Sequence, residues 1–216
     1  MNNEDWVTIK PHLVSAIRET VKQFQDHPAD FLSECDIQAV MFAGLRNELS
    51  HLRMHYVASC DKDKCLGESL EISQVLTEHQ ISPEGHCDIA ILCSDQDTSA
   101  PNIWEQPCRI SIEIKLWQAL EYHNWNEPRG PQKDVEKLQR YWKRRDENRH
   151  PFTGIAMLFR HPGAFACHEV GEFASTDYEA AFPENGVAIH VISNEGHRWK
   201  MAPDSRPMAV TVPTTA

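Results

Sequence analysis

Three residues whose side chains could do hydrolytic chemistry fall in two apolar segments of the chain. Asp88 is the one charged residue in HCDIAILC (86–93), and Glu113 and Lys115 lie two apart in RISIEIKLWQ (109–118). Side chains two apart on a strand leave the same face of a sheet, so Glu113 and Lys115 should point in one direction. Carboxylates are ligands that Mg²⁺ prefers, and a nearby lysine can orient an attacking water and help to deprotonate it. The three residues together predict a site for metal-assisted hydrolysis of a phosphate ester.

The polar side of 109–118 also has a simpler explanation. Four apolar residues alternate with the polar ones, namely Ile110, Ile112, Ile114 and Leu116. A half-exposed or edge strand would place its polar side in solvent, where a cross-strand neighbour could pair with it. Asp88 argues against this explanation, because a carboxylate among apolar neighbours is costly unless a partner compensates it.

The elements that must position these residues follow from periodicity. Apolar residues at helical spacing predict helices over 5–25, from about 30 to 55, and over 131–148. Short apolar or alternating runs predict strands at 73–79, 86–93, 108–117, 153–160 and 186–193. The turn PEG at 83–85 should join the first two strands as a hairpin. This order predicts an α/β (α+β) fold with a mixed central β-sheet flanked by helices.

The second predicted helix carries polar residues on its apolar stripe. Glu34 and Gln38 lie at +3 and +7 from Phe31, so they fall on the core-facing side. Glu34 should therefore approach the sheet from inside the fold.

Composition restricts the class of protein. The chain has 216 residues, 41% hydrophobic and 25% charged, which suits one folded domain over 1–200 with a mobile tail at 201–216. No apolar run is long enough to span a membrane, and the start lacks a signal core, so a cytoplasmic location is expected.

Seven scattered cysteines favour free thiols over a disulfide framework. Four residues of the kinds that bind zinc, His51, His55, Cys60 and Cys65, have a spacing that matches no closed zinc module, so zinc binding there stays open.

A basic segment stands out in an acidic protein. The formal net charge of −11 excludes indiscriminate nucleic-acid binding, but 129–149 contains eight Lys or Arg. The expected phosphate contacts within it are Lys133, Lys137, Arg140, Lys143, Arg144 and Arg145. A merely solvated helix face is the alternative.

The residues resemble the PD-(D/E)xK nuclease superfamily, which includes many restriction endonucleases. The matching elements are CD at 87–88, EIK at 113–115, SECDIQ at 33–38 and DVEKL at 134–138, and the resemblance covers roughly 30–160. Cys87 stands where the family has proline, which is not a ligand. The resemblance implies a restriction-endonuclease-like core.

The resemblance also implies roles for the individual residues. Asp88, Glu113 and the Ile114 carbonyl would bind Mg²⁺, for which Mn²⁺ could substitute. Lys115 would be the catalytic lysine and Glu34 an auxiliary acid. The implied activity is that of an endonuclease that hydrolyses double-stranded DNA in restriction or defence, as a homodimer because duplex cleavage needs two sites. A repair or recombination nuclease of the same superfamily and a non-catalytic, nuclease-like interaction module are the alternatives.

Overall fold

The computed structural model describes residues 3–57, 69–81, 85–94, 103, 106–117, 130–147, 151–162, 173–175 and 181–203. Its helices are α1 (Asn3–Asp26), the 3-10 turn η1 (Pro28–Asp30), α2 (Glu34–Glu48) and α3 (Pro131–Glu147). Its strands are β1 (Arg53–Val57), β2 (Ser69–Ser73), β3 (Val75–Gln80), β4 (His86–Leu92), β5 (Cys108–Trp117), β6 (Thr153–Arg160), β7 (Ala174–Ser175), β8 (Gly186–Ser193) and β9 (Gly196–Met201).

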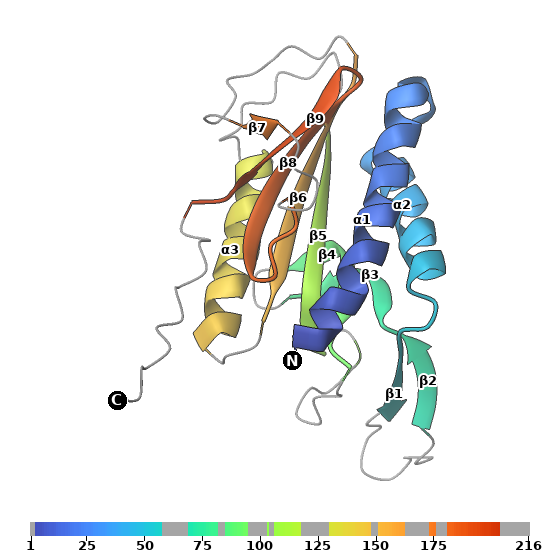
Figure 1. Cartoon of the computed structure of the whole chain (residues 1–216), viewed down its shortest axis with the longest axis vertical. Helices are drawn as coiled ribbons and strands as arrows, with labels where there is room; N and C mark the ends of the chain where they lie inside the picture. The colour runs from blue at the N-terminus through green and yellow to red at the C-terminus, as the bar shows by residue number, and fades with distance from the viewer. Residues whose placement is uncertain are drawn as a thin grey trace.

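A mixed seven-stranded sheet forms the centre of the molecule, with strand order β3-β4-β5-β6-β8-β9-β7. The central strands β5, β6 and β8 are parallel, and the strands on both sides of them pair antiparallel. β1 and β2 form a separate antiparallel pair beside the body (Figure 1). The predicted mixed α/β architecture is confirmed.

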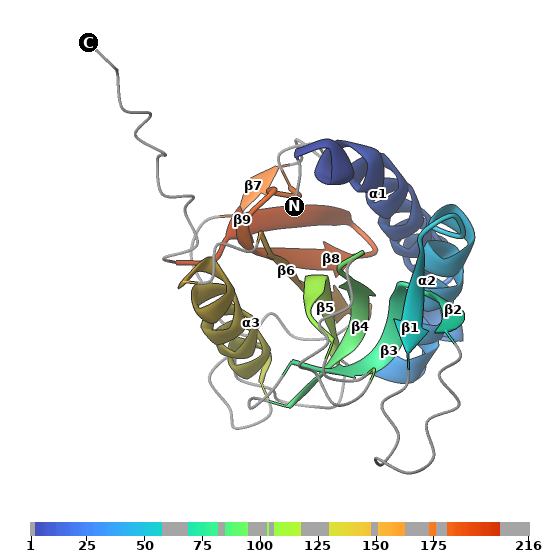
Figure 2. The same ribbon diagram turned by 90° about the horizontal axis from the view of Figure 1, so that it is seen from below.

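The helices cover both faces of the sheet. α1 and α2 lie on one side and α3 lies on the other (Figure 2). Ile110, Ile112, Ile114 and Leu116 pack in the cluster that contains the apolar stripes of α1 and α2, whereas Trp117 packs in the cluster that contains Val135 and Leu138 of α3. The polar face of β5 therefore lies under α3. The half-exposed explanation for β5 is wrong, since Arg109, Ser111 and Glu113 are all buried.

The second predicted helix is wrong at both ends. α2 begins at Glu34, where Ser33 and Asp36 form a capping box, and the helix ends at Glu48. Phe31 precedes the helix and is still buried. Residues 53–57 are β1, in which Met54 and Tyr56 are buried while Arg53 and His55 are exposed. That period-two pattern belongs to a strand whose partner, β2, lies beyond 58–68.

The sheet also extends further than predicted at its carboxyl-terminal edge. β9 was not predicted, and Met201, the expected start of the tail, ends this strand. The amide of the buried Ala202 donates to the Val187 carbonyl oxygen at 2.8 Å. The rest of the predicted tail, 204–216, lies outside the described residues. In the described part of the chain, no helix has the length and apolarity needed to cross a membrane.

Candidate active site

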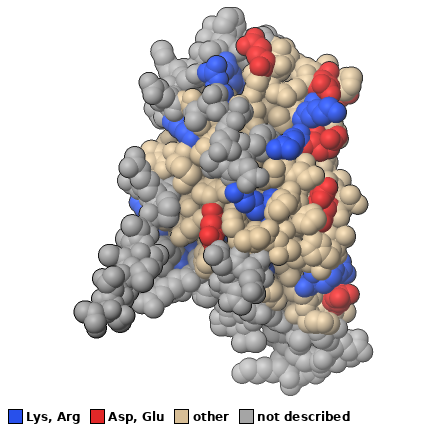
Figure 3. Space-filling view, in the orientation of Figure 1, with Lys and Arg blue, Asp and Glu red and all other residues tan. Residues whose placement is uncertain are grey.

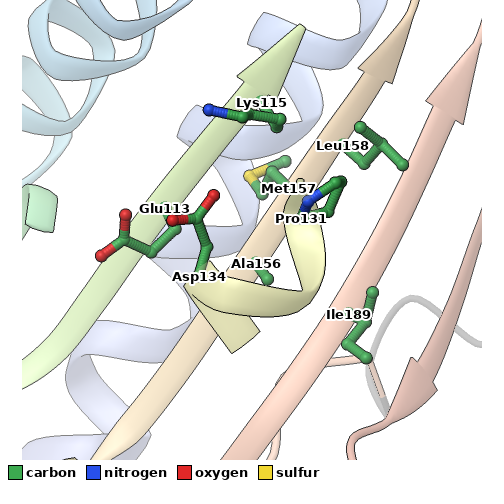
Figure 4. Close-up of a pocket in the computed structure, with 8 residues that line it drawn as sticks. All are labelled: Glu113, Lys115, Pro131, Asp134, Ala156, Met157, Leu158 and Ile189. Atoms are coloured by element: carbon green, nitrogen blue, oxygen red, sulfur yellow. The ribbon is translucent and has the colours of Figure 1, made fainter. Parts of the chain in front are cut away.

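Glu113 and Lys115 leave the same face of β5 and line one pocket at the start of α3. The pocket is also lined by Pro131 and Asp134 of α3 and by Ala156, Met157, Leu158 and Ile189 of the neighbouring strands. The three charged side chains gather on one side of the pocket and the apolar ones on the other (Figure 4). The shared direction predicted for Glu113 and Lys115 is thus observed, and α3 adds a second carboxylate.

Asp88 sits where the pairing of β4 with both neighbouring strands is interrupted. The β4–β5 ladder stops at Ile89–Ile112, and Asp88 Oδ2 instead accepts a 2.6 Å hydrogen bond from the Ile114 amide. The side chains of β4 do not alternate strictly here: Cys87 packs with Ala90 and Leu92 in the cluster on the α3 side, while Ile89 and Ile91 pack on the other side. The Ile114 amide thus donates to the Asp88 side chain in place of a backbone carbonyl oxygen of β4. This bond fixes the Asp88 carboxylate beside the backbone of Ile114, between Glu113 and Lys115.

The other side of Asp88 is held by α2 and β3. Gln38 donates one hydrogen bond to the Asp88 carbonyl oxygen at 2.8 Å and another to Glu78 Oε1 at 2.9 Å. Glu78 has φ +51°, a left-handed conformation that is uncommon for a residue other than glycine. It faces the interruption at Asp88, since the flanking residues Thr77 and His79 are both paired with β4. The polar stripe predicted for α2 therefore contributes to this site.

Glu34, the other polar residue of that stripe, reaches Lys115. Its Oε1 lies 3.2 Å from Lys115 Nζ and accepts a 3.3 Å hydrogen bond from the Leu116 amide. One carboxylate oxygen thus contacts both the backbone and the lysine, which fixes the direction of the Lys115 side chain.

Lys137 occupies the centre of the charged cluster rather than the protein surface. Its ammonium lies 2.8 Å from Glu113 Oε1 and 3.8 Å from Asp134 Oδ1, and it donates to the His86 carbonyl oxygen at 2.8 Å. The Lys137 side chain is 16% exposed and that of Glu113 is 5% exposed. Lys137 is one of the predicted phosphate contacts, and in the structure its charge is taken up by Glu113 and Asp134.

Burial sets the protonation of this cluster. Desolvation raises the pKa of Asp88 to about 6 and the pKa of Glu113 well above its ordinary value, and the nearby Asp88 raises the Glu113 pKa further. Burial also raises the pKa of Asp134, against the pull of Lys115 and Lys137. For Lys137, burial lowers the pKa, but the adjacent Glu113 and the nearby Asp134 and Asp88 outweigh it and the pKa is raised. Lys137 is thus the cation that lowers the pKa of Asp88 and Glu113, while Lys115 and Lys137 together act on Asp134.

Asp88→Asn should stabilise the metal-free protein at pH 7. Folding raises the Asp88 pKa from 3.8 to about 6, so its favourable contribution is full below pH 4 and is lost as the pH rises through 6. Asparagine stays neutral and can still accept from the Ile114 amide. We expect the variant to gain on the order of 2 kcal/mol in unfolding free energy at pH 7, measured with urea in EDTA, and the gain to vanish near pH 4. A variant that is less stable than wild type at both pH values would make Asp88 a structural residue only.

The remaining basic residues of α3 divide into two groups. Lys133, Arg140 and Lys143 are exposed, although Arg140 lies 3.9 Å from Glu136. Arg144 lies over the Tyr141 ring and Arg145 donates to the Cys93 sulfur, so both are partly buried against the body. On the visible face of the described residues, Lys and Arg are interspersed with Asp and Glu rather than gathered in one basic patch (Figure 3).

The histidines outside the charged cluster lie in different environments. His79 of β3 is fully buried and bonds to the Gln106 carbonyl oxygen at 2.8 Å, whereas His86 of β4 is exposed. Of the four residues considered for zinc, His51 contacts the His12 ring and His55 is exposed on β1. Cys60 and Cys65 lie outside the described residues.

The donor set fits a divalent cation in its chemistry. Asp88 and Glu113 carry hard oxygen ligands, and a cation would relieve the repulsion between them. The Lys137 ammonium already contacts Glu113 Oε1 and the His86 carbonyl oxygen, as a metal cation could. Within the described ranges, no group of three or more His, Cys, Asp or Glu side chains could hold one ion. A metal would therefore rest on two carboxylates and a backbone oxygen, with Lys137 giving up its contact with Glu113.

Comparisons with protein-family models, with curated proteins and with solved structures find no match to this chain. The arguments about function therefore rest on the geometry of the cluster itself.

Proposed function

We propose that the protein is a metal-dependent nuclease that hydrolyses phosphodiester bonds in DNA. The observation that supports this most directly is the placement of Glu113 and Lys115 on one face of β5, with the Asp88 carboxylate bound to the amide between them. A surface ion pair would not need a carboxylate in place of a ladder hydrogen bond. The raised pKa values of Asp88 and Glu113 in a pocket are also typical of functional groups.

Each residue has a role in this proposal. Asp88, Glu113 and the Ile114 carbonyl would hold Mg²⁺ or Mn²⁺, and the bound ion would stabilise negative charge that develops on the phosphate. Lys115 would orient the attacking water and stabilise charge beside it, and Glu34 would hold the Lys115 ammonium in place. Lys137 would balance the carboxylates while no metal is bound.

Double-stranded DNA is the proposed substrate, and restriction or defence against foreign DNA is the proposed setting. A homodimer is part of this proposal, because one site cuts one strand. A repair or recombination nuclease would use the same residues on branched or damaged DNA.

The test is incubation of the purified protein with plasmid, linear duplex, single-stranded DNA and RNA, each with Mg²⁺, Mn²⁺ or EDTA. We expect metal-dependent cleavage of duplex DNA. Discrete products would indicate sequence recognition, and selective cleavage of branched DNA would favour the repair or recombination role. No hydrolysis of any substrate with either metal would contradict the proposal.

A non-catalytic interaction module is the second candidate, and the Lys137–Glu113 ion pair favours it. An ammonium 2.8 Å from Glu113 gives this buried carboxylate a partner without any metal. The two candidates differ in their response to metal alone. A nuclease should melt at higher temperature as Mg²⁺ or Mn²⁺ is added, since a ligand that binds only the folded state stabilises it, whereas the module should not respond.

A further inference from the structure

A second cavity lies at the carboxyl-terminal end of the parallel strands. It is lined by Arg160 of β6, Val191 and Ser193 of β8, Gly196 and Arg198 of β9, and Glu195 in the turn between β8 and β9. Its volume of about 130 Å³ is large enough for a phosphate group and several waters. The lining includes two arginines and one glutamate, so the formal charge of the lining residues is positive within an acidic protein.

The cavity opens on the same side of the sheet as the candidate active site. Strand pairing connects Lys115 to Leu158, Leu158 to Val191, and Val191 to Arg198. Residues paired across a sheet share a face, so Lys115 and Arg198 leave the sheet in the same direction. Arg160 belongs to this face too, because it is paired with Trp117, which lies two residues beyond Lys115 on β5.

α3 leaves this end of the sheet uncovered among the described elements. The helix starts beside Lys115, where Pro131 and Asp134 line the first pocket. Further along the helix, Trp142 donates to Asn185, next to the start of β8. The helix thus runs toward the amino ends of the parallel strands, and the β8–β9 turn extends past it at the other end (Figure 1).

We propose that the cavity between Arg160 and Arg198 binds a backbone phosphate of the nucleic acid whose scissile phosphate lies at Lys115. Guanidinium groups match the geometry of phosphate oxygens and bind them with charge-assisted hydrogen bonds. Glu195 is exposed, and the lining has two arginines to this one carboxylate. This inference rests on the proposed function and adds the path that the substrate takes from the active site.

The spacing suits a polymer with regularly placed charges. Three strand separations of about 4.8 Å put Arg198 roughly 14 Å from Lys115 along the sheet. A duplex carries phosphates about every 3.4 Å of axis on each strand, so a bound duplex offers phosphates at both places at once. At about 3.4 Å per base-pair step, a phosphate bound in the cavity would lie about four steps from the cleavage point.

The test compares three double variants that each remove two positive charges. Arg160→Gln with Arg198→Gln removes the cavity charges, Lys133→Gln with Lys143→Gln removes exposed charges from α3, and Arg18→Gln with Lys22→Gln removes exposed charges from α1 on the opposite face. Binding of a labelled 20-base-pair duplex is measured in EDTA over a range of salt concentrations. We expect the cavity variant to lose at least tenfold in affinity and to lower the salt slope by about 1 to 2, and the α1 control to bind like wild type. The α3 variant measures separately the phosphate contacts expected at Lys133 and Lys143.

A second arm identifies the source of the phosphate. Inorganic phosphate is titrated against the melting temperature of wild type and of the cavity variant. Loss of duplex affinity in the cavity variant supports the proposal whether or not phosphate alone binds. If phosphate stabilises only wild type while duplex affinity is unchanged, the cavity takes a free phosphate compound and the nucleic-acid path is overturned. If neither duplex nor phosphate distinguishes the cavity variant from the α1 control, the cavity is not a phosphate site.

Failure of the inference is separable from failure of the proposed function. Cleavage by the wild type with unchanged duplex binding by the cavity variant would overturn the cavity site and leave the nuclease in place. Arginine-dependent duplex binding without cleavage under any metal condition would keep the phosphate site and remove the nuclease.

Discussion

Replacement of Lys115 by Ala is expected to reduce metal-dependent DNA cleavage by a factor of about 10³ while leaving the fold intact. The Lys115 side chain is 27% exposed and ends at the pocket, so its loss removes charge from the site without opening the core. A charged group positioned where the transition state develops charge typically contributes a factor of 10² to 10³. The measurement is single-turnover cleavage of duplex DNA at saturating Mg²⁺, with melting temperatures as the check on folding.

Two further variants separate catalysis from general charge effects. Lys22→Ala removes an exposed lysine from α1, on the opposite face of the sheet, and should cleave at the wild-type rate. Glu34→Gln keeps the size of the side chain that holds Lys115 and should lose about tenfold, since a positioning contact is weakened rather than lost. Wild-type cleavage by a folded Lys115→Ala protein would remove Lys115 from the mechanism.

Lys137→Met is expected to destabilise the metal-free protein by roughly 3 to 5 kcal/mol at pH 7. The substitution leaves Glu113 buried without the ammonium that lies 2.8 Å away, and removal of one partner of a buried ion pair costs about this much. Because burial already raises the Glu113 pKa, protonation of this carboxyl limits the cost, and the loss should shrink as the pH falls. Urea unfolding in EDTA at pH 7 and pH 5 measures both effects.

The matched control is Lys133→Met, which makes the same change at an exposed position one turn earlier on α3 and should alter stability by less than about 0.5 kcal/mol. Adding Glu113→Gln to Lys137→Met should restore part of the stability, because no buried charge then remains unpaired. Equal effects of the two methionine variants would show that the Lys137–Glu113 contact contributes nothing to the fold.

The sequence predicted the strand that carries the site but not what covers it. Alternation in 108–117 defined β5 to the residue, and the shared face of Glu113 and Lys115 followed from the two-residue period. Charge counting then took Lys137 for a surface residue, because a basic helix looks the same in sequence whether its lysines meet solvent or buried carboxylates. Asp134, one helical turn before Lys137, lies in the DVEKL segment that matched the resemblance. It was given no role, because the sequence did not show that this helix covers the site.

Non-local pairing explains the elements that were missed. β1 finds its partner β2 only after eleven intervening residues, so the alternation of Met54 and Tyr56 was absorbed into the preceding helix. β9 follows β8 after a two-residue turn, and its alternating His197, Arg198, Trp199 and Lys200 could have been recognised as a strand. Because β9 was not predicted, nothing placed Arg198 near Arg160, and the second cavity could not be predicted.

The hydrogen bond from the Ile114 amide to Asp88 links the state of the site to local opening of the backbone. Ile112 is paired with Ile89 in the β4–β5 ladder and the Leu116 amide donates to Glu34, which is not a proposed metal ligand, whereas the Ile114 amide donates to a carboxylate that a metal would share. Exchange of that single amide proton with solvent would then report how firmly the carboxylate is held. The bond that positions the candidate ligand thus also makes one backbone position a natural probe of the occupied and empty states.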